Sequence, residues 1–151
     1  MVDRFERFSL AIADISRYWH KIAGDEMEHY GLKGPHATYL VTISRHKDGL
    51  TASQLCELCG KDKSDVSRMM SILEQKGLIR KESLSQSGYR SRFVLTQAGA
   101  VAAEQVRRRA SLAVELAGKN LTDENRAVFY DVLEQIAGNL KELSKKGLPL
   151  E

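Results

Sequence analysis

Residues 60–77 read GKDKSDVSRMMSILEQKG, and LIRKE follows directly at 78–82. Asp62 suits the position before a helix, because its carboxylate can accept hydrogen bonds from the free amides of the first turn. Gly77 is typical of the position after a helix, where the chain turns left-handed. The stretch therefore predicts a short helix over 63–76, whose apolar residues recur at steps of three and four: Val66, Met69, Met70 and Leu73.

The opposite face of this helix is predicted to be exposed, and it carries Ser64, Ser67, Arg68 and Ser71. Small hydroxyl side chains let a helix approach base edges and phosphates closely. An arginine can offer two parallel donors to guanine in the major groove. The positive end of the helix, beside Lys63, favours a phosphate. The alternative is a solvated surface helix whose serines bind nothing.

A helix and a ribbon are predicted on either side of this segment. The sequence Thr-Ala-Ser-Gln at 51–54 is a capping box, which opens a short helix that ends at Gly60. Residues 78–82 and 89–95 have the pattern of two strands, and the polar residues 85–88 are typical of a turn between them. Two short helices followed by a basic ribbon indicate a winged helix-turn-helix.

Longer helices are predicted towards both ends of the chain. Apolar residues from Phe5 to Ile22 repeat at steps of three and four, which predicts a helix over about 3–30 with a narrow apolar seam. A second helix is expected at about 36–46, with Tyr39, Leu40 and Ile43 on its inner face. Thr96 is expected to cap a helix over 97–117, and Thr122 opens a strongly amphipathic last helix to about 145.

The predicted fold class is mainly α with a small β-ribbon. We expect an N-terminal dimerisation helix at 1–34, a winged helix-turn-helix lobe at 35–96 and C-terminal dimerisation helices at 97–151. These three parts are expected to form one structural unit.

The charge is concentrated in the predicted lobe. Residues 60–92 contain eight Lys and Arg against four Asp and Glu, whereas the net charge of the whole chain is +3. This asymmetry favours an anionic partner. No apolar run approaches the roughly 20 residues that cross a bilayer, and the N-terminus lacks the apolar centre of a secretory signal. We therefore expect a cytoplasmic protein that does not bind membranes.

The run GLTASQLCELCGKDKSDVSRMMSILEQKGLIRKE at 49–82, followed by a ribbon and FVLTQAG at 93–99, resembles the MarR family of bacterial transcription regulators. The resemblance implies a homodimer that binds double-stranded DNA at a pseudo-palindromic operator, and a repressor released by a small anionic or phenolic effector. Many members have an Asp-x-Arg signature at the ribbon, where this chain has Gly88-Tyr89-Arg90. The acidic residue is missing, so either Arg90 or Arg92 is expected at the tip.

The resemblance also implies site residues. Contacts of the recognition helix fall on Lys63, Ser64, Asp65, Ser67 and Arg68, those of the preceding helix on Ser53 and Gln54, and those of the ribbon on Arg90 and Arg92. An effector crevice would be lined by Trp19, His20, Tyr39 and Ile43, and the alternative is that these four residues are ordinary core.

The sequence favours other functions less. No phosphate-binding GxxxxGK[ST], HExxH or GxSxG motif is present, so we expect no enzyme and no cofactor. Cys56 and Cys59 allow a redox-sensing regulator, but cysteines beside Leu55 and Leu58 are typically small buried hydrophobes. The four histidines are scattered and predict no metal site. A winged helix that binds a protein partner remains the alternative to DNA binding, and the basic residues favour DNA.

Overall fold

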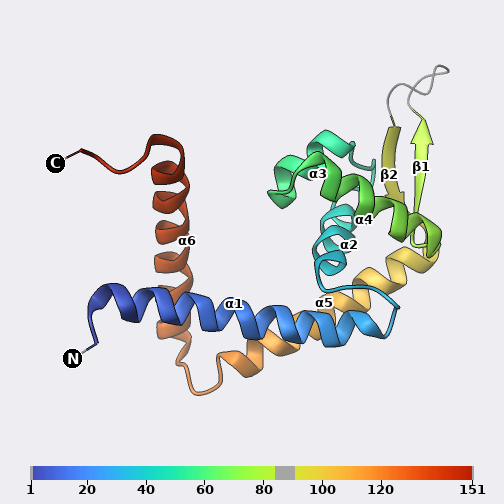
Figure 1. Ribbon diagram of the computed structural model, residues 1–151. Helices are drawn as coiled ribbons and strands as arrows, with labels where there is room; N and C mark the ends of the chain where they lie inside the picture. The colour runs from blue at the N-terminus through green and yellow to red at the C-terminus, as the bar shows by residue number, and fades with distance from the viewer. Residues whose placement is uncertain (1, 84–90, 151) are drawn as a thin grey trace. The chain divides into compact units, whose positions relative to one another are not determined.

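The computed structural model describes residues 2–83 and 91–150. The described residues form six helices and one two-stranded antiparallel sheet (Figure 1). The predicted fold class, mainly α with a small β-ribbon, is confirmed. The elements in chain order are α1 (Arg4–Glu28), α2 (Pro35–Ser44), α3 (Ala52–Cys59), α4 (Lys63–Gln75), β1 (Ile79–Ser83), β2 (Ser91–Leu95), α5 (Gln97–Ala117) and α6 (Asp123–Lys146).

The helices start at the residues that the capping chemistry indicated. The Thr51 hydroxyl accepts from the Gln54 amide, and the Gln54 side chain accepts from the Thr51 amide, which completes the predicted capping box of α3. The Asp62 side chain caps α4 by accepting from the Asp65 amide, and the Thr122 side chain caps α6 by accepting from the Asn125 amide. These bonds satisfy amides that have no partner within the helix itself. Gly60 ends α3 in the left-handed conformation, with φ of 61°.

The ribbon pairs β1 with β2 from Ile79 opposite Leu95 to Ser83 opposite Ser91. Leu50, just before α3, adds a bridge to Phe93 by two backbone hydrogen bonds of 2.8 and 3.1 Å. The ribbon is thereby attached to the start of the helix-turn-helix. The predicted turn at 85–88 lies outside the described residues, as do Tyr89 and Arg90.

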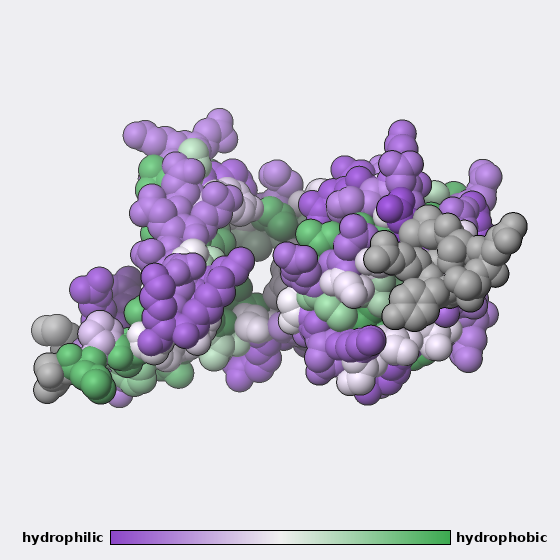
Figure 2. Space-filling model, turned by 90° about the horizontal axis from the view of Figure 1, so that it is seen from above, coloured by the Kyte–Doolittle hydropathy of each residue, from purple (hydrophilic) through white to green (hydrophobic). Residues whose placement is uncertain are grey.

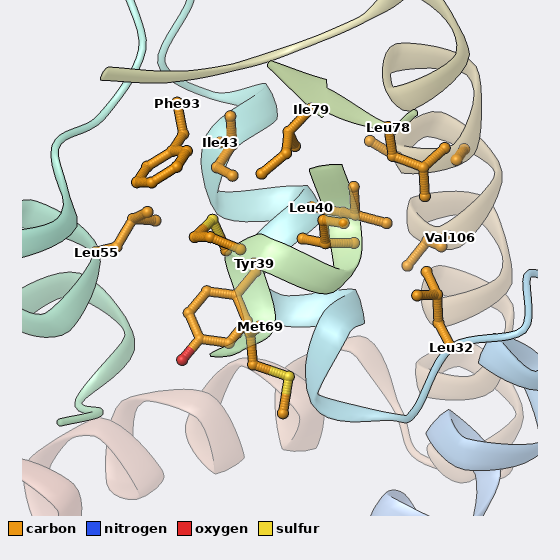
Figure 3. Close-up of a cluster of buried hydrophobic side chains, with 14 of the residues drawn as sticks. Leu32, Tyr39, Leu40, Ile43, Leu55, Met69, Leu78, Ile79, Phe93 and Val106 are labelled. Carbon is orange, nitrogen blue, oxygen red and sulfur yellow. The ribbon is translucent and has the colours of Figure 1, made fainter. Parts of the chain in front are cut away.

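One apolar cluster forms the core of this lobe (Figure 3). It contains buried residues of α2, α3, α4 and the ribbon, including Leu40, Leu55 and Leu73, none of which is measurably exposed. The two flanking helices also contribute, α1 through Met27 and α5 through Ala102, Ala103 and Val106. The core of the lobe is therefore completed by segments from outside 35–96.

Gly99 allows α5 to pack closely against the backbone of Leu78, the residue directly before β1. A Cβ atom at this position would overlap the Leu78 carbonyl oxygen and lie 2.8 Å from the carbonyl carbon. Thr96 closes the same junction, because its amide donates to the Leu78 carbonyl at 3.1 Å and its hydroxyl donates to the Gly77 carbonyl at 2.6 Å. The Gly99 amide in turn donates to the Thr96 hydroxyl oxygen at 3.0 Å, which caps α5.

The chain divides into two compact units, Met1–Ser111 and Leu112–Glu151. The first unit contains the lobe together with α1 and most of α5, and the second contains the end of α5 and all of α6. The three-part division predicted from the sequence stays a prediction. No helix in the described ranges is both long and apolar enough to cross a membrane.

Candidate nucleic-acid interface

Helix α4 is divided into a buried face and an exposed face as predicted. Val66, Met69, Met70 and Leu73 all belong to the core, whereas Ser64, Ser67, Arg68 and Ser71 are exposed. The Arg68 side chain retains 66% of its accessible surface. In the view of Figure 2, hydrophilic residues cover much of the surface of the lobe, with hydrophobic residues in smaller patches between them.

The N-terminus of α4 is held by a network around Asp62. The Asp62 carboxylate accepts from the Asp65 amide at 2.7 Å and from the Ser64 hydroxyl at 2.9 Å. The bond from the Asp65 amide is the main cause that lowers the pKa of Asp62. Lys61 and Lys63 are exposed on either side of this cap. These hydrogen bonds therefore fix the conformation of the first turn of α4. The exposed Lys61 and Lys63 flank the N-terminus of α4, which is the positive end of the helix dipole.

Asp65 is engaged within the protein. Its carboxylate accepts from the Tyr39 hydroxyl at 2.7 Å through Oδ2 and from Arg68 Nη2 at 3.0 Å through Oδ1. The bond from Tyr39 is the largest cause that lowers the pKa of Asp65, and the ion pair with Arg68 acts in the same direction. Burial, reinforced by the nearby carboxylate, raises the pKa of Tyr39. Asp65 was predicted to contact DNA, and the structure shows that both its oxygens serve internal contacts.

Helix α3 presents Ser53 and Gln54 to solvent, as its predicted role requires. The Gln54 side-chain oxygen is also the acceptor in the capping box, which fixes the orientation of the amide group. Leu58 on the same helix is 55% exposed.

In the ribbon, Arg92 is partly buried rather than displayed. Its Nη1 donates to the Asp48 carbonyl oxygen at 3.4 Å, and its Nε is buried without a protein partner. Arg80 on β1 forms an ion pair with Glu82 at 2.8 Å and remains exposed. Arg90, the other predicted contact of the ribbon, lies outside the described residues.

The structure adds basic residues that the sequence analysis did not single out. Arg45 and Lys47 are exposed between α2 and α3, and Lys61 is exposed between α3 and α4. Arg45 and Lys61 both act electrostatically on the Cys59 thiol, in the direction that lowers its pKa. The run Arg-His-Lys at 45–47 was a sequence signal for this cluster, but its position next to α3 depends on the fold.

The predicted effector residues do not share one environment. Tyr39 and Ile43 are buried in the core, with exposures of 1% and 2%. Trp19 is 42% exposed on α1, and His20 is exposed beside it with its Nδ1 2.6 Å from the Ser16 carbonyl oxygen. For Tyr39 and Ile43 the structure agrees with the alternative that they are core residues. An effector crevice stays a prediction.

The two cysteines are free and partly buried against the core. The Cys59 Sγ lies 3.8 Å from the Thr42 hydroxyl oxygen, and burial raises the pKa of the Cys59 thiol. A raised pKa disfavours the thiolate, which is the form that peroxide oxidises. Among the described residues, no group of three or more His, Cys, Asp or Glu is arranged to hold a metal ion.

Comparison with known proteins agrees with this geometry. Residues 30–88 match a model of the MarR family. A MarR protein from Peptoclostridium difficile superposes with a TM-score of 0.85 at 18% identity, covering 97% of this chain and 96% of that one. A MarR family regulator from Listeria monocytogenes, solved in complex with a 26mer DNA, gives 0.81 at 23% identity, covering 100% and 99%.

The Staphylococcus aureus MepR–DNA complex gives a TM-score of 0.80 at 21% identity, covering 88% of this chain and 97% of that one. A search of curated protein sequences finds no match. The family model covers the segment that contains both helices of the helix-turn-helix, and the solved structures extend the same fold over both termini. Residues 30–88 are therefore similar to the MarR family of transcriptional regulators, and the chain as a whole has the winged helix-turn-helix fold of these solved structures.

Proposed function

We propose that this protein binds double-stranded DNA in a sequence-specific manner, with α4 as the helix that enters the major groove. The observation that carries the proposal is the division of α4 into a buried apolar face and an exposed face of serines and Arg68. Small hydroxyl groups allow close approach to the bases, and Arg68 supplies a donor pair for a guanine. The family consists of transcriptional regulators, so the expectation that the chain is not an enzyme agrees with this proposal.

Phosphate contacts would surround this reading face. Lys61 and Lys63 lie at the N-terminus of α4, and Ser53 and Gln54 are exposed on α3. Such contacts set the position of a protein on the duplex without reading its sequence. Arg45 is a further exposed cation of the lobe, directly after α2. Arg92 is less suited to contact phosphate than these residues, because its guanidinium already donates to the Asp48 carbonyl oxygen.

The protein acts as a homodimer in this proposal. Helix α6 buries none of its residues within the chain, and α1 buries Met27 alone. Each helix by itself exposes a series of large apolar side chains, such as Phe5 and Ile15 on α1 and Phe129 and Leu133 on α6. Exposed apolar surface of this extent is typical of an interface. A two-fold dimer would present two α4 helices to half-sites about 34 Å apart on a pseudo-palindromic operator.

We also propose that the dimer represses transcription by occupying its operator, and that a small anionic or phenolic effector releases it. An effector can do so only if it binds more tightly to a conformer whose recognition helices are wrongly spaced. The resemblance to the family supports this part of the proposal.

The test is a selection of bound sequences from a random duplex pool, followed by affinity measurements on the enriched site. An enriched inverted repeat is expected. Arg68→Ala should weaken binding to that site by about 1–3 kcal/mol. Arg108→Ala is the matched control, because Arg108 is an exposed arginine on α5 and its loss changes the charge equally.

Two outcomes would count against the proposal. If the Arg68 and Arg108 variants lose equal affinity for the selected site, the exposed face of α4 does not read the bases. Affinity should also fall steeply with salt, because phosphate contacts release counterions. Binding that is indifferent to salt, or a pool without enrichment, would favour a protein partner.

A further inference from the structure

We propose that Tyr39 and Asp65 together position Arg68 for base reading, so that the hydroxyl of a core tyrosine contributes to DNA sequence specificity. This inference rests on the proposed function of α4. It assigns a positioning role to two side chains that the sequence analysis had placed elsewhere, Tyr39 in an effector crevice and Asp65 on the DNA.

The three side chains form a continuous chain from the core to the surface. The Tyr39 ring comes from α2 and is 1% exposed, so its position is set by packing. Figure 3 shows the ring within the cluster and its hydroxyl oxygen at the edge. That hydroxyl donates to Asp65 Oδ2 at 2.7 Å, and the other oxygen of Asp65 accepts from Arg68 at 3.0 Å. Arg68 itself is exposed, with 66% of its side-chain surface accessible.

The Tyr39 hydroxyl orients the Asp65 carboxylate. In the described part of the chain, no side chain other than Tyr39 donates to Oδ2, so without this hydroxyl the carboxylate would be held by Arg68 alone. Hydrogen bonds to an ionised acceptor are short and strong, which makes this contact an effective anchor. The hydrogen bond from Tyr39 lowers the pKa of Asp65, the direction expected when a donor binds the ionised carboxylate.

The oriented carboxylate in turn restricts Arg68. An exposed arginine samples many rotamers, and this freedom is lost when it binds a base. Asp65 engages one donor of the guanidinium, and an arginine has five, so donors remain for a guanine edge. Part of the loss of Arg68 side-chain freedom has then already occurred before DNA binds. Such preorganisation affects base contacts, whereas contacts to phosphate depend on the number of cations.

The test uses Tyr39→Phe, which removes the hydroxyl and keeps the ring in the core. The affinity for the selected site is expected to fall about five-fold or more. The fall should not exceed the loss expected when a complete arginine–guanine contact is removed. Affinity for a random duplex of equal length, and the salt dependence of both, should stay unchanged. The selected motif should also lose information at the base pair that Arg68 contacts.

Tyr30→Phe is the matched control. The Tyr30 hydroxyl donates to the Gln105 side chain of α5 at 2.6 Å, so its removal breaks a bond that involves neither Asp65 nor Arg68. Its removal is expected to leave the ratio of specific to non-specific affinity unaltered. If both variants reduce that ratio equally, or if neither does, the positioning role is refuted. Thermal unfolding of both variants shows whether each is folded at the assay temperature.

A double-mutant cycle distinguishes the positioning of Arg68 from a general structural role of Tyr39. In an Arg68→Ala background, Tyr39→Phe should cause no further loss of specificity, because the residue it positions is gone. Asp65→Asn, which keeps the shape and removes the charge, should reproduce the loss of Tyr39→Phe. Full additivity of Tyr39→Phe and Arg68→Ala would overturn the inference. The proposed function fails separately, if the unmodified protein does not discriminate between duplexes.

Discussion

Replacing Gly99 with alanine is predicted to loosen the junction between the ribbon and α5. The added Cβ would overlap the Leu78 carbonyl oxygen and lie 2.8 Å from the carbonyl carbon. Non-bonded heavy atoms pack best at about 3.5–4.0 Å, so α5 would have to retreat from the Leu78 carbonyl oxygen by about 1.5–2 Å. Both partners are backbone, which leaves no flexible side chain to absorb the change.

The cost has two parts. Overpacking of this kind typically costs about 1–3 kcal/mol. The retreat also strains the bonds that Thr96 makes to Leu78 and Gly77, at 3.1 and 2.6 Å, and each is worth about 1 kcal/mol. We therefore expect Gly99→Ala to lower the free energy of unfolding by about 3–5 kcal/mol. For a chain of this size that corresponds to a fall in Tm of about 10 °C.

Urea unfolding followed by circular dichroism measures this loss, at equal protein concentrations because dimerisation adds to stability. Gly24→Ala is the control, since a Cβ at Gly24 in α1 meets nothing within 4 Å. There the alanine should stabilise the protein by about 0.5–1 kcal/mol through its helix propensity. A free energy of unfolding for Gly99→Ala within about 1 kcal/mol of the unmodified protein would refute the reasoning from close approach.

Three further predictions follow from local chemistry. Thr51→Ala removes the capping box with Gln54 and should lower the free energy of unfolding by about 1 kcal/mol in the same urea assay. Burial lowers the pKa of His36, so the folded protein holds a neutral imidazole while the unfolded chain gains a proton below about pH 6.5. Stability should therefore be complete above that pH and fall below it. His36→Gln should flatten the pH profile of Tm, and the exposed His46→Gln should not. Because burial raises the pKa of Cys59, iodoacetamide should alkylate it more slowly than free cysteine at pH 7.5. Rapid trapping of a sulfenic acid there would restore the redox hypothesis.

The elements themselves were predictable because their signals are local. Thr51, Asp62 and Thr122 satisfy amides within three residues of themselves, and Gly60 ends α3 through its own backbone freedom. The two faces of α4 follow from helical periodicity. These features depend on neighbours along the chain, so one sequence is enough to derive them. The candidate reading face, including Arg68, was found in this way.

The partners of side chains were not predictable, because they come from residues far apart in the sequence. Tyr39 and Asp65 are 26 positions apart, and the bond between them depends on how α2 packs against α4. Arg92 resembled an exposed wing residue until the fold placed its guanidinium against the Asp48 carbonyl, 44 positions away.

The sequence by itself thus determined which residues form helices, where the helices begin and end, and which face of α4 is exposed, because hydrogen bonding and periodicity act over a few residues. Only the tertiary structure decided which polar groups meet. Those contacts require the packing of distant segments around one core, and a periodic pattern contains no information about that packing.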